Sequence, residues 1–287
     1  MSKHKKLTEK SGGVPSLNEL RAEIDRIDEE MHSLLIKRGE IIGSLIAVKK
    51  TQESGAAFRP AREAWMMRRL VERHRGLLPL DTVESIWRVI ISTFTFIQAN
   101  YSVHADISAG DAVIRDSSRF HFGFTVPLVP HVGAKSVIAA VAVSKGDLGL
   151  IPATIITDSD AWWTALEGEQ APKIIARLPF VERSDHPASL PLFVISKPLV
   201  ADATAAEVET WSIAVGGWSA AVVRAVSSFA EVLAMPQGNF DGATLLVSVP
   251  HGQRDKIVAA LQAAGSSVRS MALVGGHATR YTVLPGK

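Results

Sequence analysis

Apolar residues recur at alternating intervals of three and four along the first fifty residues of the chain. This spacing places them on one face of an α-helix, so it predicts a long amphipathic helix over residues 17–48. Ser16 and Glu19 match a capping box, in which each side chain bonds the backbone N–H of the other residue. The apolar stripe consists of Leu17, Leu20, Ile24, Ile27, Met31, Leu34, Ile41, Leu45 and Val48.

Two further helices are predicted before residue 104. Residues 51–58 include a glycine and are typical of a loop, and Pro60 is well placed as the first residue of a second helix that extends to about Arg75. Asp81 and Glu84 repeat the capping pattern at the start of a third helix. Its predicted apolar face consists of Val83, Ile86, Trp87, Ile90, Ile91, Phe94, Ile97 and Tyr101.

The pattern changes after about His104 to short apolar runs separated by glycine, proline and aspartate, which is typical of alternating strands and helices. Strands are predicted at 120–126, 148–151, 190–196, 211–215 and 244–249, with one or two more between 271 and 283. Helices are predicted at 136–144, 220–233 and 253–264.

The predicted fold class is therefore a multidomain α and α/β protein, with a three-helix N-terminal domain followed by an α/β region. The expected domains are a flexible tail at 1–15, a helical domain at 16–104, an α/β region at 105–200 and a small α/β region at 201–287. The last region has the alternation of a regulatory domain, and a boundary is placed near residues 199–209.

Composition narrows the possible functions. The 287 residues are 47% hydrophobic and 21% charged, with a formal net charge of +2, which predicts a globular protein that binds no nucleic acid. The absence of cysteine excludes disulfides, thiolate metal sites and cysteine nucleophiles. There is no apolar run of 18 residues and no apolar core of a secretory signal, so we expect no membrane partner and a cytoplasmic location.

Charge is distributed unevenly along the chain. Residues 1–104 contain 17 Lys and Arg against 13 Asp and Glu, whereas the remaining residues contain 14 against 16. The excess of positive charge in the first segment suits an anionic partner.

Polar side chains interrupt the apolar stripes at two positions. Arg38 occupies the position between Leu34 and Ile41 where an apolar residue is expected, and Gln98 follows Phe94 at an interval of four. An arginine on a buried seam costs several kcal/mol unless it is paired. Each residue has a structural interpretation, in which Arg38 snorkels or pairs with a carboxylate and Gln98 bonds a backbone group. Each also has a functional one, as part of a pocket.

Arg21 and Lys49 share one flank of the long helix, but 28 residues at 1.5 Å each separate them by about 42 Å. They cannot contact the same small ligand within one chain. If two copies pair antiparallel about a two-fold axis, however, Arg21 of the partner subunit can join Arg38 and Lys49. Arg62 and Glu63, on the first turn of the second helix, would add a cation and a carboxylate, although each alone is also typical of a solvated surface charge.

Such a pocket would bind a small dianion. It has no cysteine or inward histidine, and the nine histidines of the chain show no metal-ligand spacing, so we expect no metal and no cofactor. The pocket could still act by positioning a substrate and by stabilising the charge that develops on it, and these two effects suffice for a pericyclic rearrangement.

Residues 17–103 resemble the all-helical chorismate mutases, in the form fused to prephenate dehydratase in many bacteria. The resemblance is carried by LNELRAEIDRIDEEMHSLLIKRGEIIGSLIAVKK, RPAREAWMMRRL and IWRVIISTFTFIQ. It implies an isomerase that converts chorismate to prephenate in aromatic amino acid biosynthesis, and an intertwined homodimer of three-helix chains. By resemblance, Arg21 would be lent to the partner's site to bind a substrate carboxylate, Arg38 would hold the other carboxylate and Arg62 would support this network.

The same resemblance assigns three more roles. Lys49 and Gln98 would hydrogen-bond the ether oxygen of the substrate, and Glu63 would accept the ring hydroxyl. The chain departs from the family at Arg59, where an Asp is common, and at Phe94, where a Ser is common. Neither change removes a charge that the rearrangement requires.

The region after residue 104 resembles prephenate dehydratase only faintly. Ala153 and Thr154 replace the family's Glu-Asn pair, and Pro191 and Leu192 stand where Thr-Arg is usual. We therefore expect a degenerate dehydratase-like or regulatory region without dehydratase activity. Two alternatives stay open: a bifunctional chorismate mutase/prephenate dehydratase, and a non-catalytic dimer that binds an aromatic acid and regulates another enzyme.

Overall fold

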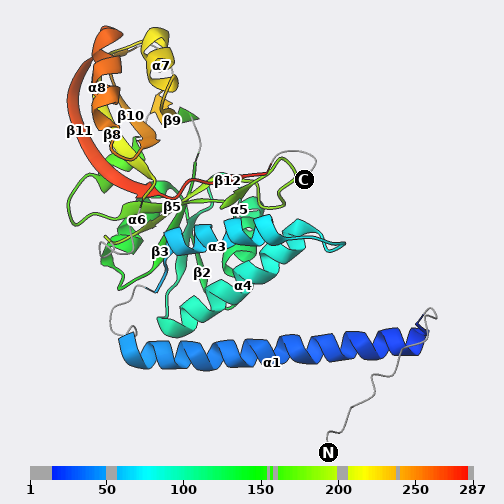
Figure 1. Cartoon of the computed structure of the whole chain (residues 1–287). Coiled ribbons are helices and arrows are strands. Elements are labelled where there is room, and N and C mark those ends of the chain that lie inside the picture. The colour runs from blue at the N-terminus through cyan, green and yellow to red at the C-terminus, as the bar shows by residue number, and fades with distance from the viewer. Residues whose placement is uncertain are drawn as a thin grey trace, which may run out of the picture. The chain divides into compact units, whose positions relative to one another are not determined.

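The computed structural model describes residues 15–49, 57–153, 156–157, 161–198, 206–236 and 240–283. The chain divides into two compact units, Met1–Lys49 and Lys50–Lys287, which are described separately (Figure 1). The predicted tail at 1–15, apart from its last residue, and most of the predicted loop at 51–58 lie outside the described residues. The domain boundaries expected from the sequence stay predictions.

The described part of the first unit is dominated by helix α1, Leu17–Lys49, which confirms the predicted long helix. The capping box is present, because Ser16 N donates to Glu19 Oε2 at 2.8 Å and Glu19 N donates to Ser16 Oγ at 3.3 Å. The apolar stripe is exposed in the single chain, with Ile24 at 57% and Ile41 at 68% exposure. An exposed stripe of this length favours association with another surface.

The second unit begins with α3 (Pro60–Arg73) and α4 (Leu80–Gln98). Pro60 starts α3 as predicted. The capping predicted for Asp81 and Glu84 is wrong, because α4 starts at Leu80, two residues before the start that an Asp81 cap gives, and has no side-chain cap. The Asp81 carboxylate instead accepts a bond from Thr82 N within the first turn, and Glu84 is buried.

Helix α4 buries a stripe of polar residues in addition to apolar ones. Ile86 and Ile97, both predicted to face the core, are 39% and 48% exposed, so the predicted apolar face is wrong in phase at these positions. The buried polar residues recur at intervals of four, four and three: Glu84, Arg88, Ser92 and Thr95. Periodicity did not distinguish the two faces because apolar residues occur on both of them.

The rest of the second unit is an α/β region. Its first part consists of β1 (Val103–Asp106), α5 (Asp111–Phe122), β2 (Leu128–His131), α6 (Ala134–Val143), β3 (Leu148–Pro152), β4 (Ile156–Thr157), η1 (Trp162–Leu166), β5 (Lys173–Leu178), β6 (Val181–Glu182) and β7 (Leu192–Ser196). Its second part consists of β8 (Val208–Trp218), α7 (Ala220–Ser227), β9 (Glu231–Pro236), β10 (Phe240–Pro250), α8 (Arg254–Ala263), β11 (Ser267–His277) and β12 (Tyr281–Thr282).

Ten of these strands form one sheet in the order β2-β1-β3-β7-β5-β11-β8-β10-β9-β4, and β12 pairs with β6. Strands β2, β1 and β3 are parallel, whereas β8 to β11 form an antiparallel βαββαβ arrangement of the ferredoxin-like type. The two parts meet where Gly275 of β11 pairs with Ile174 of β5. This approach requires glycine, because a Cβ at Gly275 would lie 2.1 Å from the carbonyl oxygen of Ile174.

Three apolar clusters form the core of this unit. The first joins Met67 and Leu70 of α3 and Ile91 of α4 to residues of α5, β1, β5 and β7, such as Phe122. The second packs side chains of β3 and β7 together with side chains of β9 and β10, so the sheet curls. The third lies between the antiparallel strands and helices α7 and α8. The helices α3 and α4 are therefore part of the same core as the α/β region.

Several predicted elements are corrected by the structure. Residues 120–126 are not a strand, because α5 continues to Phe122 and ends at Gly123, which adopts a φ of 68°. The helix predicted at 220–233 ends at Ser227, and residues 231–236 form β9, which pairs with β10. The strands predicted at 148–151, 190–196, 211–215 and 244–249 and the helices at 136–144 and 253–264 are confirmed within a few residues. Residues 199–205 of the predicted boundary lie outside the described residues.

Candidate functional site

Helix α1 carries three of the predicted site residues. Arg21 is exposed in its first half, and Arg38 is half-buried in its second half. Lys49 is the last residue of the helix, and its side chain lies outside the described part. The three cations are thus spread along one long helix, as the sequence predicts.

The other three predicted residues lie on α3 and α4. Arg62 is exposed, whereas the neighbouring Glu63 is only 4% exposed. Gln98 ends α4, is half-buried, and donates from Nε2 to the carbonyl oxygen of Phe94 at 3.0 Å. In this conformation Gln98 bonds a backbone group, as its structural interpretation expects.

These two sets of residues belong to different compact units. Each unit is described by itself, so the structure does not join the cations of α1 to Glu63 and Gln98 in one pocket. Their convergence stays a prediction of the sequence.

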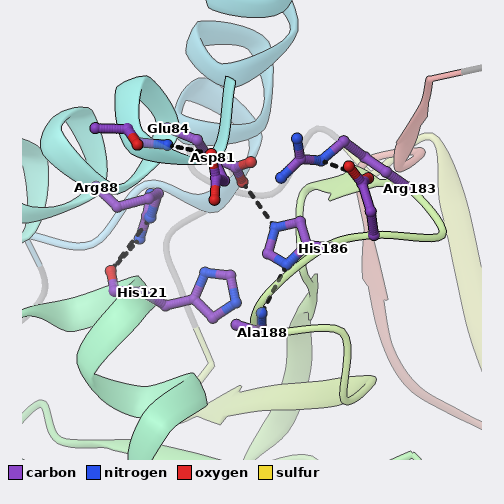
Figure 2. A network of polar contacts seen from close by, with 9 residues as sticks. Asp81, Glu84, Arg88, His121, Arg183, His186 and Ala188 are labelled. Atoms are coloured by element: carbon purple, nitrogen blue, oxygen red, sulfur yellow. Dashed lines mark hydrogen bonds and ion pairs between the residues drawn. The ribbon is translucent and has the colours of Figure 1, made fainter. Parts of the chain in front are cut away.

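The carboxylate of Glu63 is paired with Arg88, a residue that sequence reasoning missed. Arg88 Nη1 lies 2.6 Å from Glu63 Oε2, and the two side chains are 1% and 5% exposed. The Nε and Nη2 atoms of Arg88 donate to the carbonyl oxygen of His121 at 3.2 and 2.9 Å. This carbonyl lies at the carboxyl end of α5, where a cation is favoured by the helix dipole (Figure 2).

Burial governs the proton affinity of this pair. Loss of hydration raises the pKa of Glu63 above its ordinary value, and the charge and hydrogen bond of Arg88 oppose this rise. The pKa of the nearby Tyr101 hydroxyl is raised as well, first by burial and then by the negative charge of Glu63. Arg88 therefore favours the ionised form of a carboxyl group whose pKa burial raises.

A second buried pair lies one turn earlier on α4. Glu84 Oε1 is 3.3 Å from His186 Nε2, and both side chains are fully buried. The backbone N–H of Ala188 donates to His186 Nδ1 at 3.0 Å, so Nδ1 is an acceptor and the proton is assigned to Nε2, which donates to Glu84 (Figure 2). The ring of His186 stacks on His121 with a centroid separation of 6.1 Å. Burial, then Arg88 and His186, lower the pKa of His121 well below its usual value.

One signal in the sequence could have found this network. Glu84 and Arg88 lie four residues apart on a helix, which is the spacing of side chains that share a face. Their partners His121 and His186 come from distant segments, so no local pattern indicates them. The polar stripe of α4 was therefore visible in principle, but its burial was not.

Two of the pockets in the described part of the α/β region lie at strand ends. One, of about 360 Å³, lies at the carboxyl ends of β1 and β3 and includes Asp106, whose Oδ1 accepts bonds from Ser108 N at 3.0 Å and Gly133 N at 2.9 Å. The other, of about 420 Å³, lies beside β5 and β11 and includes Lys173 and His277. Ala153, which stands where the dehydratase family has Glu, follows β3 directly, and Thr154 lies outside the described residues.

No metal-binding cluster of three or more His, Asp or Glu residues occurs within the described ranges. Over the same ranges, none of the helices combines the length and apolar character needed to cross a membrane.

Comparison with known families identifies the N-terminal part of the chain. Residues 20–99 match the family model described as chorismate mutase type II. We call this matched region the mutase domain. The mutase domain contains all six predicted site residues, and it includes most of α1 together with all of α3 and α4, so it extends over both compact units.

The curated relatives of the chain combine this domain with a second one. A bifunctional chorismate mutase/prephenate dehydratase from Pseudomonas aeruginosa is 27% identical over 140 residues, which cover 47% of this chain and 38% of the relative. A protein of the same description from Aquifex aeolicus is 28% identical over 143 residues, covering 48% and 39%. The chain thus spans about two fifths of the length of the curated relatives it matches.

Solved structures show a weaker likeness. A prephenate dehydratase from Streptococcus mutans covers 63% of this chain at 12% identity and a TM-score of 0.34. A structure described as GqqA, a novel type of quorum quenching acylase, covers 61% of this chain at 14% identity and a TM-score of 0.39. At these scores the likeness defines neither the fold nor the function of the α/β region.

Proposed function

We propose that this chain is a chorismate mutase, an isomerase that rearranges chorismate to prephenate in aromatic amino acid biosynthesis. The observation that supports the proposal most directly is the family match of residues 20–99, within which all six candidate site residues lie. The names of the curated relatives include the same activity.

The reaction requires only a bound and correctly folded substrate. Within one dianionic molecule a C–O bond breaks while a C–C bond forms, and neither a proton nor an electron is exchanged with the protein. Arg38 and Arg21 of the partner subunit would hold the two carboxylates. Lys49 and Gln98 would bond the ether oxygen, where negative charge develops as the C–O bond breaks. These residue types suit the task because each donates hydrogen bonds to an anionic oxygen.

The remaining two residues would complete the site. Glu63 would accept the ring hydroxyl of the substrate, and Arg62 would support the carboxylate network. Glu63 suits this role because it is ion-paired with Arg88, which opposes the rise in its pKa that burial causes. Arg62 is exposed in the single chain, so a ligand or a partner subunit can approach it.

A homodimer through the N-terminal helices is part of the proposal. The apolar stripe of α1 is exposed, and so are Ile86, Val89 and Ile97 of α4. Pairing of two chains would remove these surfaces from water and would supply Arg21 to the opposite site.

The test is a chorismate absorbance assay on the purified full-length chain, with Arg38→Ala and Lys49→Ala as variants. Removing a group that stabilises the developing charge is expected to lower kcat by about 10²–10³. Arg26→Ala is the matched control, because Arg26 lies on the exposed surface of the same helix and pairs locally, with Glu23 and Glu30. Wild-type protein that leaves chorismate at its spontaneous rate would contradict the proposal.

Two alternatives have distinct outcomes in the same assay. The bifunctional reading is favoured by the names of the relatives, and formation of phenylpyruvate from prephenate would support it; we expect none, because Ala153 and Thr154 replace the expected Glu-Asn pair. A non-catalytic, aromatic-acid-binding dimer would bind phenylalanine or tyrosine, and Arg38→Ala and Lys49→Ala would leave any residual turnover unchanged.

A further inference from the structure

A buried arginine lies between Glu63, one of the expected site residues, and the α/β region. Arg88 lies on α4 and contacts both Glu63 of α3 and the last turn of α5. We propose that Arg88 is a positioning residue that holds the Glu63 carboxylate ionised and oriented for the ring hydroxyl of the substrate, with the carboxyl end of α5 as its anchor. This inference rests on the proposed mutase function and assigns a role to a residue outside the expected set.

The hydrogen bonds of Arg88 fix the orientation of its guanidinium group. All three nitrogens of its guanidinium are bonded, Nη1 to Glu63 Oε2 and the other two to the carbonyl oxygen of His121. The guanidinium carbon also lies 5.1 Å from the ring centroid of Phe180. Because the guanidinium is planar and rigid, fixing it on α5 also fixes the Glu63 oxygen that it bonds. Glu63 Oε1 would then be the atom that meets the substrate.

The charge of Arg88 matters as much as its shape. A ring hydroxyl donates its proton in a hydrogen bond, and an ionised carboxylate accepts this bond more strongly than a protonated carboxyl group does. Glu63 has lost its hydration, which favours the protonated form, and Arg88 is the cation in contact with it. Without this cation Glu63 would be protonated over more of the acidic range.

A purely structural role for Arg88 makes a different prediction. In that case Arg88 would only tie α4 to α5, and its loss would lower activity equally at every pH. Ser92 provides the matched control. It lies one turn after Arg88 on α4, and its Oγ donates to the carbonyl oxygen of Phe122 at 2.9 Å, so it links the same two helices.

The experiment measures kcat/KM for chorismate as a function of pH in the full-length wild type, Arg88→Met and Ser92→Ala. On the acidic side of this pH profile, the fall in kcat/KM is called the acidic limb. For Arg88→Met this limb is expected to move to higher pH by about one unit or more, since a close opposite charge lowers a carboxyl pKa by roughly that amount. Ser92→Ala is expected to keep the wild-type limb. Circular dichroism on each variant checks that it is folded.

Arg88→Lys is the second variant, in case the methionine variant does not fold. Lysine keeps the charge but lacks the rigid fork, so the acidic limb should stay near its wild-type position while kcat falls several-fold. A lysine variant with unchanged kcat would contradict the orienting role.

The outcomes separate this inference from the proposed function. An active wild type whose acidic limb is unmoved in Arg88→Met, or moved equally in Ser92→Ala, overturns the role of Arg88 and leaves the mutase proposal standing. An inactive wild type overturns the mutase proposal, and the role of Arg88 falls with it.

Discussion

At the scale of single residues, burial and partners decide what a side chain does. Arg38 and Arg88 are both arginines on amphipathic helices. The sequence indicates Arg38 as a candidate site residue because it interrupts an apolar stripe, but it gives no such indication for Arg88. The structure shows Arg88 to be fully buried and bonded to Glu63 and to the backbone of His121. The type and phase of a residue are local properties of the sequence, whereas its partner comes from elsewhere in the chain.

His277 shows how such an environment affects stability. Its Nδ1 donates to the carbonyl oxygen of Ala278 at 2.9 Å, and burial, aided by the charges of Arg177 and Arg280, lowers its pKa to about 4 despite this bond. In the unfolded chain a histidine titrates near 6.5. Between these values the unfolded state binds the proton more readily than the folded state, so stability decreases as the pH falls from about 6.5 to about 4.

This decrease in stability at acidic pH leads to a prediction for His277→Gln. Glutamine can keep the bond to Ala278 but does not titrate, so the loss of stability on acidification should be smaller than in the wild type, by up to about 3 kcal/mol at pH 4. Urea unfolding of both proteins at neutral and acidic pH measures the difference. Equal losses in the two proteins would show that His277 takes no part in the acid response.

At the scale of elements, local patterns predicted helices well when capping and periodicity agreed. Helix α1 and the start of α3 at Pro60 follow from the capping box, the stripe and the proline. The prediction failed for residues 120–126, because Phe120 and Phe122 belong to the end of α5 and the next strand begins only at Leu128. It also failed for the face of α4, because a second, polar stripe is buried there. Which face is covered depends on neighbours that are distant in sequence.

The exposed stripe of α1 leads to a prediction about assembly. In the proposed dimer Ile24 and Ile27 lie between two chains, and a Glu at both positions would place charges in that apolar contact. The double variant is expected to be monomeric, whereas the wild type and Ser33→Glu, on the opposite face of α1, are expected to be dimers. Light scattering coupled to size-exclusion chromatography measures the mass. A monomeric wild type would contradict the dimer.

At the scale of the whole molecule, the family domain and the structural units do not coincide. The mutase domain covers residues 20–99, whereas the compact units divide after Lys49. Helices α3 and α4 share an apolar cluster and the Arg88 contacts with the α/β region. The α/β region therefore shares its core with helices α3 and α4 of the mutase domain.

This arrangement predicts the behaviour of a chain shortened to residues 1–104. The cut exposes core residues such as Met67, Leu70 and Ile91, each of which stabilises the fold by about 1.5–3 kcal/mol when buried. The shortened chain should melt at a lower temperature and with less cooperativity than the full chain, as measured by circular dichroism. A chain lacking residues 1–15 is the control and should melt as the full chain does. A 1–104 chain with an unchanged melting curve would contradict the shared core.

The sequence by itself indicated the family resemblance of the N-terminal part, the long capped helix and the candidate site residues, because these depend on residue types at helical spacings within about a hundred residues. Only the tertiary structure decided that Glu63 is buried against Arg88, that α4 is anchored on α5 and that the two parts of the ten-stranded sheet meet at Gly275. The reason is physical: burial and ion pairing act between segments that folding brings together. A local pattern therefore indicates which side chains are available, but not which environment sets their charge.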